Sequence, residues 1–140
     1  MSWAQTATGR LNEAGFRSGA ARRRVIELLD EESCAVTALE IDRRLPEVGR
    51  ATVYRTLEQL EQLDLVLRVD LGGDGAAYER NDPGGHHHHM VCVGCGRLVP
   101  FADQALEQAI EAIGRRADFE VSAHDVLLRG RCPKCRGERG

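Results

Sequence analysis

Four of the five cysteines stand in two pairs, each with a two-residue gap. The pairs are Cys92 with Cys95 and Cys132 with Cys135. Such a gap lets both sulfurs of a pair point into one tetrahedral site, and four thiolates complete the shell of a zinc ion without room for water. Two disulfides or one redox pair are the alternative, but residues 1–11 lack the apolar stretch of a secretory signal. The spacing therefore predicts a structural zinc site.

Four consecutive histidines, 86–89, precede the first cysteine pair. Alternate side chains of a strand face opposite sides, so His86 and His88 would share one side, and His87 and His89 the other. Imidazole is a common ligand of transition metals, so the tract can serve two metal sites; the alternative is a solvated polar loop. Spacing alone does not separate further ligands from ordinary surface or core residues, and the candidates are Glu107, His124, Glu79, Asp64 and Cys34.

The N-terminal half must position any ligands on that side of the chain, and its pattern is helical. Apolar residues at helical spacing predict helices from Ser18 to about Leu29, from Thr37 to Pro46, and from Arg50 onward. Two short strands, 65–70 and 76–80, then flank a glycine-rich turn. Three helices followed by a hairpin predict a winged helix-turn-helix domain over residues 1–80.

The C-terminal half begins after a run of five turn-forming residues, 81–85, which we interpret as a hinge. Residues 90–93 and 98–101 are expected to form strands, 103–117 a helix with one apolar face, and 119–128 a final strand. About 55 residues are near the lower limit for an independent core, so metal or a second subunit is expected to help stabilise residues 86–140. The predicted fold class is α+β.

Composition leaves few other classes of protein open. The chain has 140 residues, 42% of them hydrophobic, and a net charge of -3, with no apolar run long enough for a membrane span. Residues 1–25 carry five arginines and one acid, so a net +4 lies in this segment and about -7 in the rest. Net charge therefore does not exclude a nucleic-acid partner, and a cytoplasmic protein is expected.

Three stretches resemble the ferric uptake regulator (Fur) family of metal-dependent bacterial repressors. They are Gly49–Leu57 (GRATVYRTL), His86–Phe101 with its HHxHxxCxxCG pattern, and the CxxC at Cys132. The resemblance extends from Leu11 to Cys135. It implies an N-terminal winged helix, a C-terminal α/β dimerisation domain, DNA binding switched on by metal, and structural zinc on the four paired cysteines.

The resemblance also implies two further metal sites. By position, a site within the dimerisation domain comprises His86, His88, Glu107 and His124. A regulatory site at the hinge comprises Glu79, His87 and His89, with Cys34 as an additional candidate that could equally be a small core residue. His88 stands where the commonest family motif has Asp, which resembles the zinc-responsive branch and weakens the case for iron. Asn81 stands where zinc-type members place a Cys, and Asp64 lies near the position of their aspartate.

The third predicted helix is the DNA reader of this family. The DNA contacts implied by the resemblance are Arg17, Arg22, Arg50, Ala51, Thr52, Tyr54 and Arg55. The expected function is a homodimeric repressor that binds palindromic double-stranded DNA operators when loaded with regulatory metal, most simply zinc. Sensing of iron, nickel or peroxide is the alternative. A zinc hydrolase is disfavoured because a four-thiolate site has no open position, so we expect neither an enzyme, nor a small-molecule substrate, nor a membrane partner.

Overall fold

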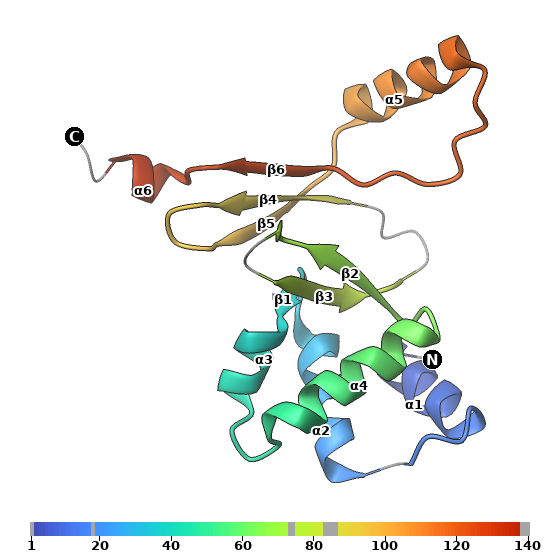
Figure 1. Ribbon diagram of the computed structural model, residues 1–140, viewed down its shortest axis with the longest axis vertical. Coiled ribbons are helices and arrows are strands. Elements are labelled where there is room, and N and C mark those ends of the chain that lie inside the picture. The colour runs from blue at the N-terminus through green and yellow to red at the C-terminus, as the bar shows by residue number, and fades with distance from the viewer. Residues whose placement is uncertain (1, 18, 73–74, 83–86, 138–140) are drawn as a thin grey trace. The chain divides into compact units, whose positions relative to one another are not determined.

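The computed structural model describes residues 2–17, 19–72, 75–82 and 87–137. The chain divides into two compact units, Met1–Gly85 and His86–Gly140 (Figure 1). The division falls at the end of the run of turn-forming residues after the hairpin. The first unit is mainly helical with a small sheet, and the second combines a sheet with helices, in agreement with the predicted α+β class. Among the described residues, no helix is long and apolar enough to cross a membrane.

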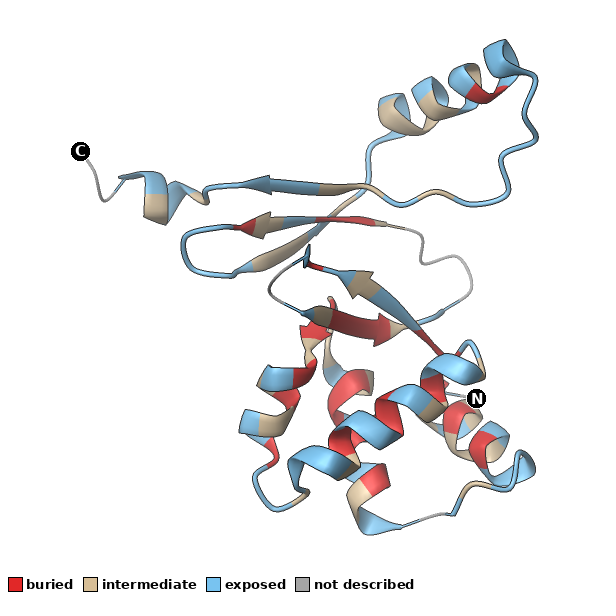
Figure 2. Ribbon diagram, viewed as in Figure 1, coloured by how far each residue is buried: buried red, intermediate tan, exposed pale blue. Residues whose placement is uncertain are grey.

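Four helices build the N-terminal unit: α1 (Trp3–Glu13), α2 (Ala20–Glu31), α3 (Ala38–Arg44) and α4 (Arg50–Gln62). Helix α3 begins as predicted, because the Thr37 hydroxyl accepts the backbone N–H of Glu40 at 3.0 Å. Helix α2 starts after Gly19 without a side-chain cap, and the predicted cap Ser18 lies outside the described residues. The apolar stripes of α2 and α4 are buried against each other and against α1 (Figure 2).

Helix α1 is an element that the predicted helices did not include. Its signals are a capping box between Ser2 and Gln5 and apolar residues four apart. These residues, Trp3, Ala7 and Leu11, are all buried. The indole Nε1–H of Trp3 donates to the carbonyl of Leu65 at 2.8 Å, which joins α1 to the loop after α4.

The hairpin of the N-terminal unit is the predicted wing. Strands β2 (Val66–Asp70) and β3 (Ala76–Arg80) pair antiparallel with Arg68 opposite Tyr78. A short strand, β1 (Val36–Thr37), adds to the other side of β3, so the strand order is β1-β3-β2. Because β1 immediately precedes α3, this pairing ties the helix-turn-helix to the wing.

A three-stranded sheet with the order β5-β4-β6 organises the C-terminal unit. Strand β4 (His88–Cys92) is central, antiparallel to β5 (Leu98–Phe101) and parallel to β6 (Leu127–Gly130). Helix α5 (Gln104–Ala117) connects β5 to β6, and α6 (Pro133–Gly137) follows β6. The predicted strand over 119–128 is wrong in its first part, since regular pairing begins only at Leu127. Asp118 adopts a left-handed conformation and Phe119 N–H bonds back to the Gly114 carbonyl, so the chain turns around the end of α5 first.

The C-terminal unit has little apolar core of its own. Among its described residues, Cys92 is the one side chain in the buried hydrophobic core, whereas the N-terminal unit contributes all the others. The predicted apolar stripe of α5 is largely uncovered, and Ile113 is 54% exposed (Figure 2). A unit of this size without a core needs other stabilisation, such as metal coordination or a second copy.

Candidate metal centres and nucleic-acid surface

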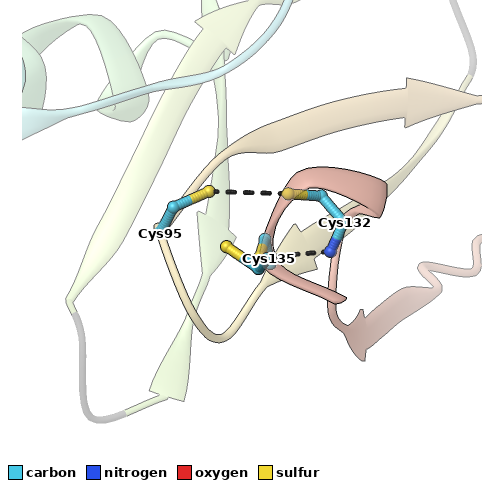
Figure 3. Close-up of side chains that lie close together, drawn as sticks. Cys95, Cys132 and Cys135 are labelled. Atoms are coloured by element: carbon cyan, nitrogen blue, oxygen red, sulfur yellow. Dashed lines mark hydrogen bonds between the residues drawn. The ribbon is translucent and has the colours of Figure 1, made fainter. Parts of the chain in front are cut away.

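The four paired cysteines converge at one end of the C-terminal sheet. Cys92 ends β4, Cys95 follows in the turn before β5, and Cys132 and Cys135 lie at the start of α6 and within it (Figure 3). Their sulfurs all lie within 4.8 Å of one another, and Cys95 Sγ is 3.9 Å from Cys132 Sγ. Sulfurs on a tetrahedral zinc ion, each about 2.3 Å from the metal, are roughly 3.8 Å apart. This separation fits zinc ligands and is far too long for a disulfide.

Backbone groups prepare these sulfurs for coordination. The N–H of Cys132 donates to Cys92 Sγ at 3.3 Å, and this bond with the N–H of Cys95 lowers the pKa of the Cys92 thiol to about 6. The neighbouring sulfur of Cys92 in turn raises the pKa of Cys135 to about 12. One thiolate is therefore present at neutral pH, and the other sulfurs lose their protons when a cation shares the site. A side chain at Gly94 would meet Cys135 Sγ at 3.0 Å, so the turn requires glycine.

A second cluster joins three segments of the C-terminal unit. His88 comes from β4, Glu107 from the first turn of α5, and His124 from the irregular segment before β6, rather than from the predicted strand. The two carboxylate oxygens of Glu107 lie 2.7 Å from Nε2 of His88 and 2.7 Å from Nε2 of His124. Hydrogen bonds from His88 and then His124 lower the pKa of the Glu107 carboxyl. The predicted fourth member, His86, lies outside the described residues.

The alternation expected for the histidine tract holds for the described members. His88 is 1% exposed and turns toward α5, whereas the ring of His89 lies 4.9 Å from the ring of His87. In the N-terminal unit, Cys34 Sγ and a carboxylate oxygen of Glu79 lie within 4.8 Å of each other. Both residues flank the pairing of β1 with β3, which is a contact between segments far apart in the sequence.

Asn81 and Asp64, which resemblance places near the hinge site, bond to each other. The Asn81 side-chain amide donates to the Asp64 carbonyl at 2.8 Å, and its backbone N–H donates to the Leu65 carbonyl at 3.0 Å. Asp64 has a φ of 56°, so this bond supports a left-handed turn at the end of α4. Asn81 therefore anchors the strand exit to the end of α4.

The N-terminal end of α4 carries the side chains expected to meet DNA. Ala51, Tyr54 and Arg55 are exposed and Thr52 is partly exposed, while the buried stripe of Val53, Leu57 and Leu60 faces the core. Exposed residues at the start of a helix-turn-helix second helix are placed to reach base edges. Arg17, before α2, is exposed as well. Arg50 is also exposed, but its Nε donates to the carboxylate of Asp42 on α3 at 3.1 Å, a partner that sequence reasoning missed.

Arg22 differs from the expectation of a DNA contact. Its side chain is buried, with 6% exposed, and Nη2 donates to Asn12 Oδ1 on α1 at 2.9 Å. Its Nη1 is also buried and has no hydrogen-bond partner within the described part of the chain. Desolvation lowers the pKa of this guanidinium. The residue lies on the side of α2 that packs on α1, so it does not present its charge to a phosphate; Arg23 and Arg24 are the exposed members of this arginine run.

Comparisons with known proteins agree with this arrangement of sites. The profile of the Ferric uptake regulator family matches residues 13–129. The ferric uptake regulation protein of Legionella pneumophila is 37% identical over 130 residues, which are 89% of this chain and 95% of that relative. The crystal structure of the Vibrio cholerae ferric uptake regulator superposes with a TM-score of 0.79 at 29% identity, covering 89% of this chain and 98% of that one.

The same fold occurs in a solved zinc uptake regulator complexed with zinc and DNA, with a TM-score of 0.61 at 18% identity over 97% of this chain and 94% of that one. That level of identity shows the fold alone. The match over most of the chain, the cysteine and histidine clusters, and the exposed start of α4 lead to one conclusion. The chain belongs to the ferric uptake regulator family of metal-responsive, DNA-binding transcriptional regulators, which are not enzymes.

Proposed function

We propose that this protein is a cytoplasmic, zinc-responsive repressor that binds palindromic operators as a homodimer. The observation that carries the metal part of this proposal is the presence of two separate clusters of nitrogen, oxygen and sulfur donors in one small unit. Sulfur and imidazole donors favour zinc over the harder cations. The presence of His88, a nitrogen donor, where the commonest family motif has an oxygen donor supports zinc as the regulatory ion.

The four-sulfur cluster serves as a structural zinc site in this proposal. A bound zinc ion would join the turn before β5 to α6 and so replace the missing apolar core. The closed shell of four thiolates leaves no position for water, which argues for stability rather than chemistry. Zinc content of the purified protein tests this directly: Cys132→Ser should lose one zinc per chain, whereas Cys34→Ser should retain it.

The second cluster, His88 with Glu107 and His124, is a further metal site in this proposal, with His86 as the fourth ligand by resemblance. Glu107 holds a position between the two imidazoles and accepts from both at 2.7 Å. The regulatory ion at the hinge would take Glu79, His87 and His89, and Cys34 as an additional ligand. The closeness of Cys34 to Glu79 supports this set, and Asn81 is left out because its amide bonds to the Asp64 carbonyl.

Metal control of DNA binding follows from the arrangement of the chain in two units. Ligands drawn from both units restrict the distance between them, which sets the spacing of the two recognition helices of a dimer on a palindrome. Coupling of about 1 to 3 kcal/mol between metal and DNA would change operator affinity some 5- to 150-fold. Without the regulatory ion, few molecules have the spacing that the operator requires.

The homodimer in this proposal uses the uncovered apolar surfaces of the C-terminal unit. The stripe of α5 includes Leu106, Ile110 and the exposed Ile113. On the sheet, Met90 lies beside Val99 and Leu128 in a pocket of about 480 Å³. Apolar surfaces that leave a unit without a core are suited to a second copy. Sedimentation should show a dimer that Ile113→Glu dissociates, whereas Glu111→Lys, a change at a 72%-exposed site on the same helix, should leave it intact.

The central experiment measures operator affinity with defined metals. DNA selected from a random library by the zinc-loaded protein would be titrated by fluorescence anisotropy with zinc, iron(II), nickel or chelator present. We expect zinc to raise affinity within the range given above, His89→Ala to abolish the response, and Glu111→Ala to preserve it. Equal affinity with and without chelator would contradict metal control. A response to iron alone would replace zinc by iron, which the names of the related regulators favour as the second candidate.

A further inference from the structure

Arg50 and Asp42 form an ion pair between the two helices of the helix-turn-helix. Arg50 is the first residue of α4 and its side chain is 67% exposed, whereas the carboxylate of Asp42 on α3 is only 18% exposed. The bond joins Arg50 Nε to Asp42 Oδ2 at 3.1 Å. The anchored end of the pair is therefore the acid, and the arginine extends from it into solvent at the end of the helix expected to enter the major groove.

The atoms used in this pair decide what Arg50 can still bind. A guanidinium carries five N–H donors in a planar fork. The bond to Asp42 uses the Nε–H, and Nη1 and Nη2 make no hydrogen bond to any described residue. Their outward N–H groups form a two-pronged donor, which matches the O6 and N7 acceptors that guanine presents in the major groove.

The charge of Asp42 favours a base over a phosphate as the target of Arg50. A paired acid offsets the charge of the arginine and so weakens its general attraction to the phosphate backbone. It does not weaken the directional donors at the tip of the guanidinium, and it holds the plane of the group. A phosphate contact needs no fixed plane, whereas a two-bond contact to guanine does.

We propose that Arg50 reads one guanine in each operator half-site and that Asp42 is the positioning residue that aims it. This inference rests on the proposed DNA-binding function and adds a specific base and a second residue to it. The neighbouring pair of Arg43 with Glu40 on α3 is more exposed on its acidic side and lies within one helix, so it supplies a matched control.

The experiment compares discrimination between base pairs in variants of the intact, zinc-loaded protein. The operator selected from a random DNA library would be changed one base pair at a time, and the loss of affinity at each position measured by anisotropy. In the wild type, replacing the guanine should cost roughly 5- to 150-fold in affinity. Arg50→Lys, which keeps the charge but loses the fork, should abolish this penalty at one position per half-site and leave the other positions unchanged.

Asp42→Asn should lower the penalty several-fold at that same position, while Glu40→Gln should leave it at the wild-type value. Thermal unfolding would be measured for each variant, and Arg50→Ala gives a second variant without the side chain. If Arg50→Ala weakens all sequences equally and reduces the slope of log affinity against log salt by about 0.9, Arg50 contacts a phosphate and the inference is overturned. If Asp42→Asn leaves discrimination unaltered, its positioning role is overturned. A wild-type protein that selects no sequence would contradict the proposed function instead.

Discussion

The buried Arg22 gives a sharp test of how the N-terminal unit is held together. Asn12→Ala would remove the acceptor at 2.9 Å from Nη2 and leave a charged, buried donor without a partner. Hydrogen bonds to charged groups contribute about 1.5 to 3 kcal/mol, so we expect a loss of stability in this range. Arg22→Met removes the buried charge together with the orphaned Nη1 and keeps most of the packing. Because the abandoned Asn12 is exposed to water, this variant should remain within about 1 kcal/mol of wild type.

Urea unfolding followed by tryptophan fluorescence is the assay, since Trp3 is the single tryptophan of the chain and is buried in the N-terminal core. The double variant should resemble Arg22→Met, because Asn12 matters only while the arginine is present. The same proteins would be titrated with operator DNA at several salt concentrations. Burial predicts that Arg22→Met leaves the salt slope unchanged, whereas removal of a phosphate contact lowers it by about 0.9. A reduced slope together with an unaffected stability of Asn12→Ala would refute this account of Arg22.

Three further outcomes follow from the contacts of other residues. Trp3→Phe should destabilise the N-terminal unit by about 1 to 3 kcal/mol in the same urea assay, because the buried Leu65 carbonyl loses its indole donor. Gly114→Ala should lower the melting temperature of the zinc-loaded protein, because the new methyl group would lie 2.9 Å from Val121; an unchanged value would show that this side chain moves aside without cost. In metal-free protein, thiolate absorbance should rise near pH 6, where the lowered pKa of Cys92 places its ionisation, and Cys92→Ser should remove that step. Because the folded pKa lies below the usual thiol value, this ionisation adds stability as pH rises from about 6 to 9, and the contribution is lost as pH falls through 6.

Local pattern was sufficient for the elements whose signal lies within a few residues. The cap at Thr37, the stripe of α4 and the two glycine-flanked strands of the wing all rest on neighbours one to four residues apart, and the structure agrees with each. The two-residue gaps of the cysteine pairs are equally local, so a four-sulfur cluster was predicted from spacing. The strand expected over 119–128 was wrong in its first part because strand pairing depends on a partner, here β4, and residues before Leu127 turn around the end of α5 instead.

The sequence by itself determined the winged helix, the cysteine cluster and the family, because helix periodicity, turn residues and ligand spacing are properties of short segments. Only the tertiary structure decided which long-range neighbours meet. It brought His88, Glu107 and His124 together from three segments, buried Arg22 against α1, and set Asp42 behind Arg50. Arg22 and Arg50 look alike in the sequence, since both are arginines near the start of a helix. Their roles separate because packing of α1 on α2 removes one guanidinium from water, whereas the turn between α3 and α4 leaves the other exposed beside an acid.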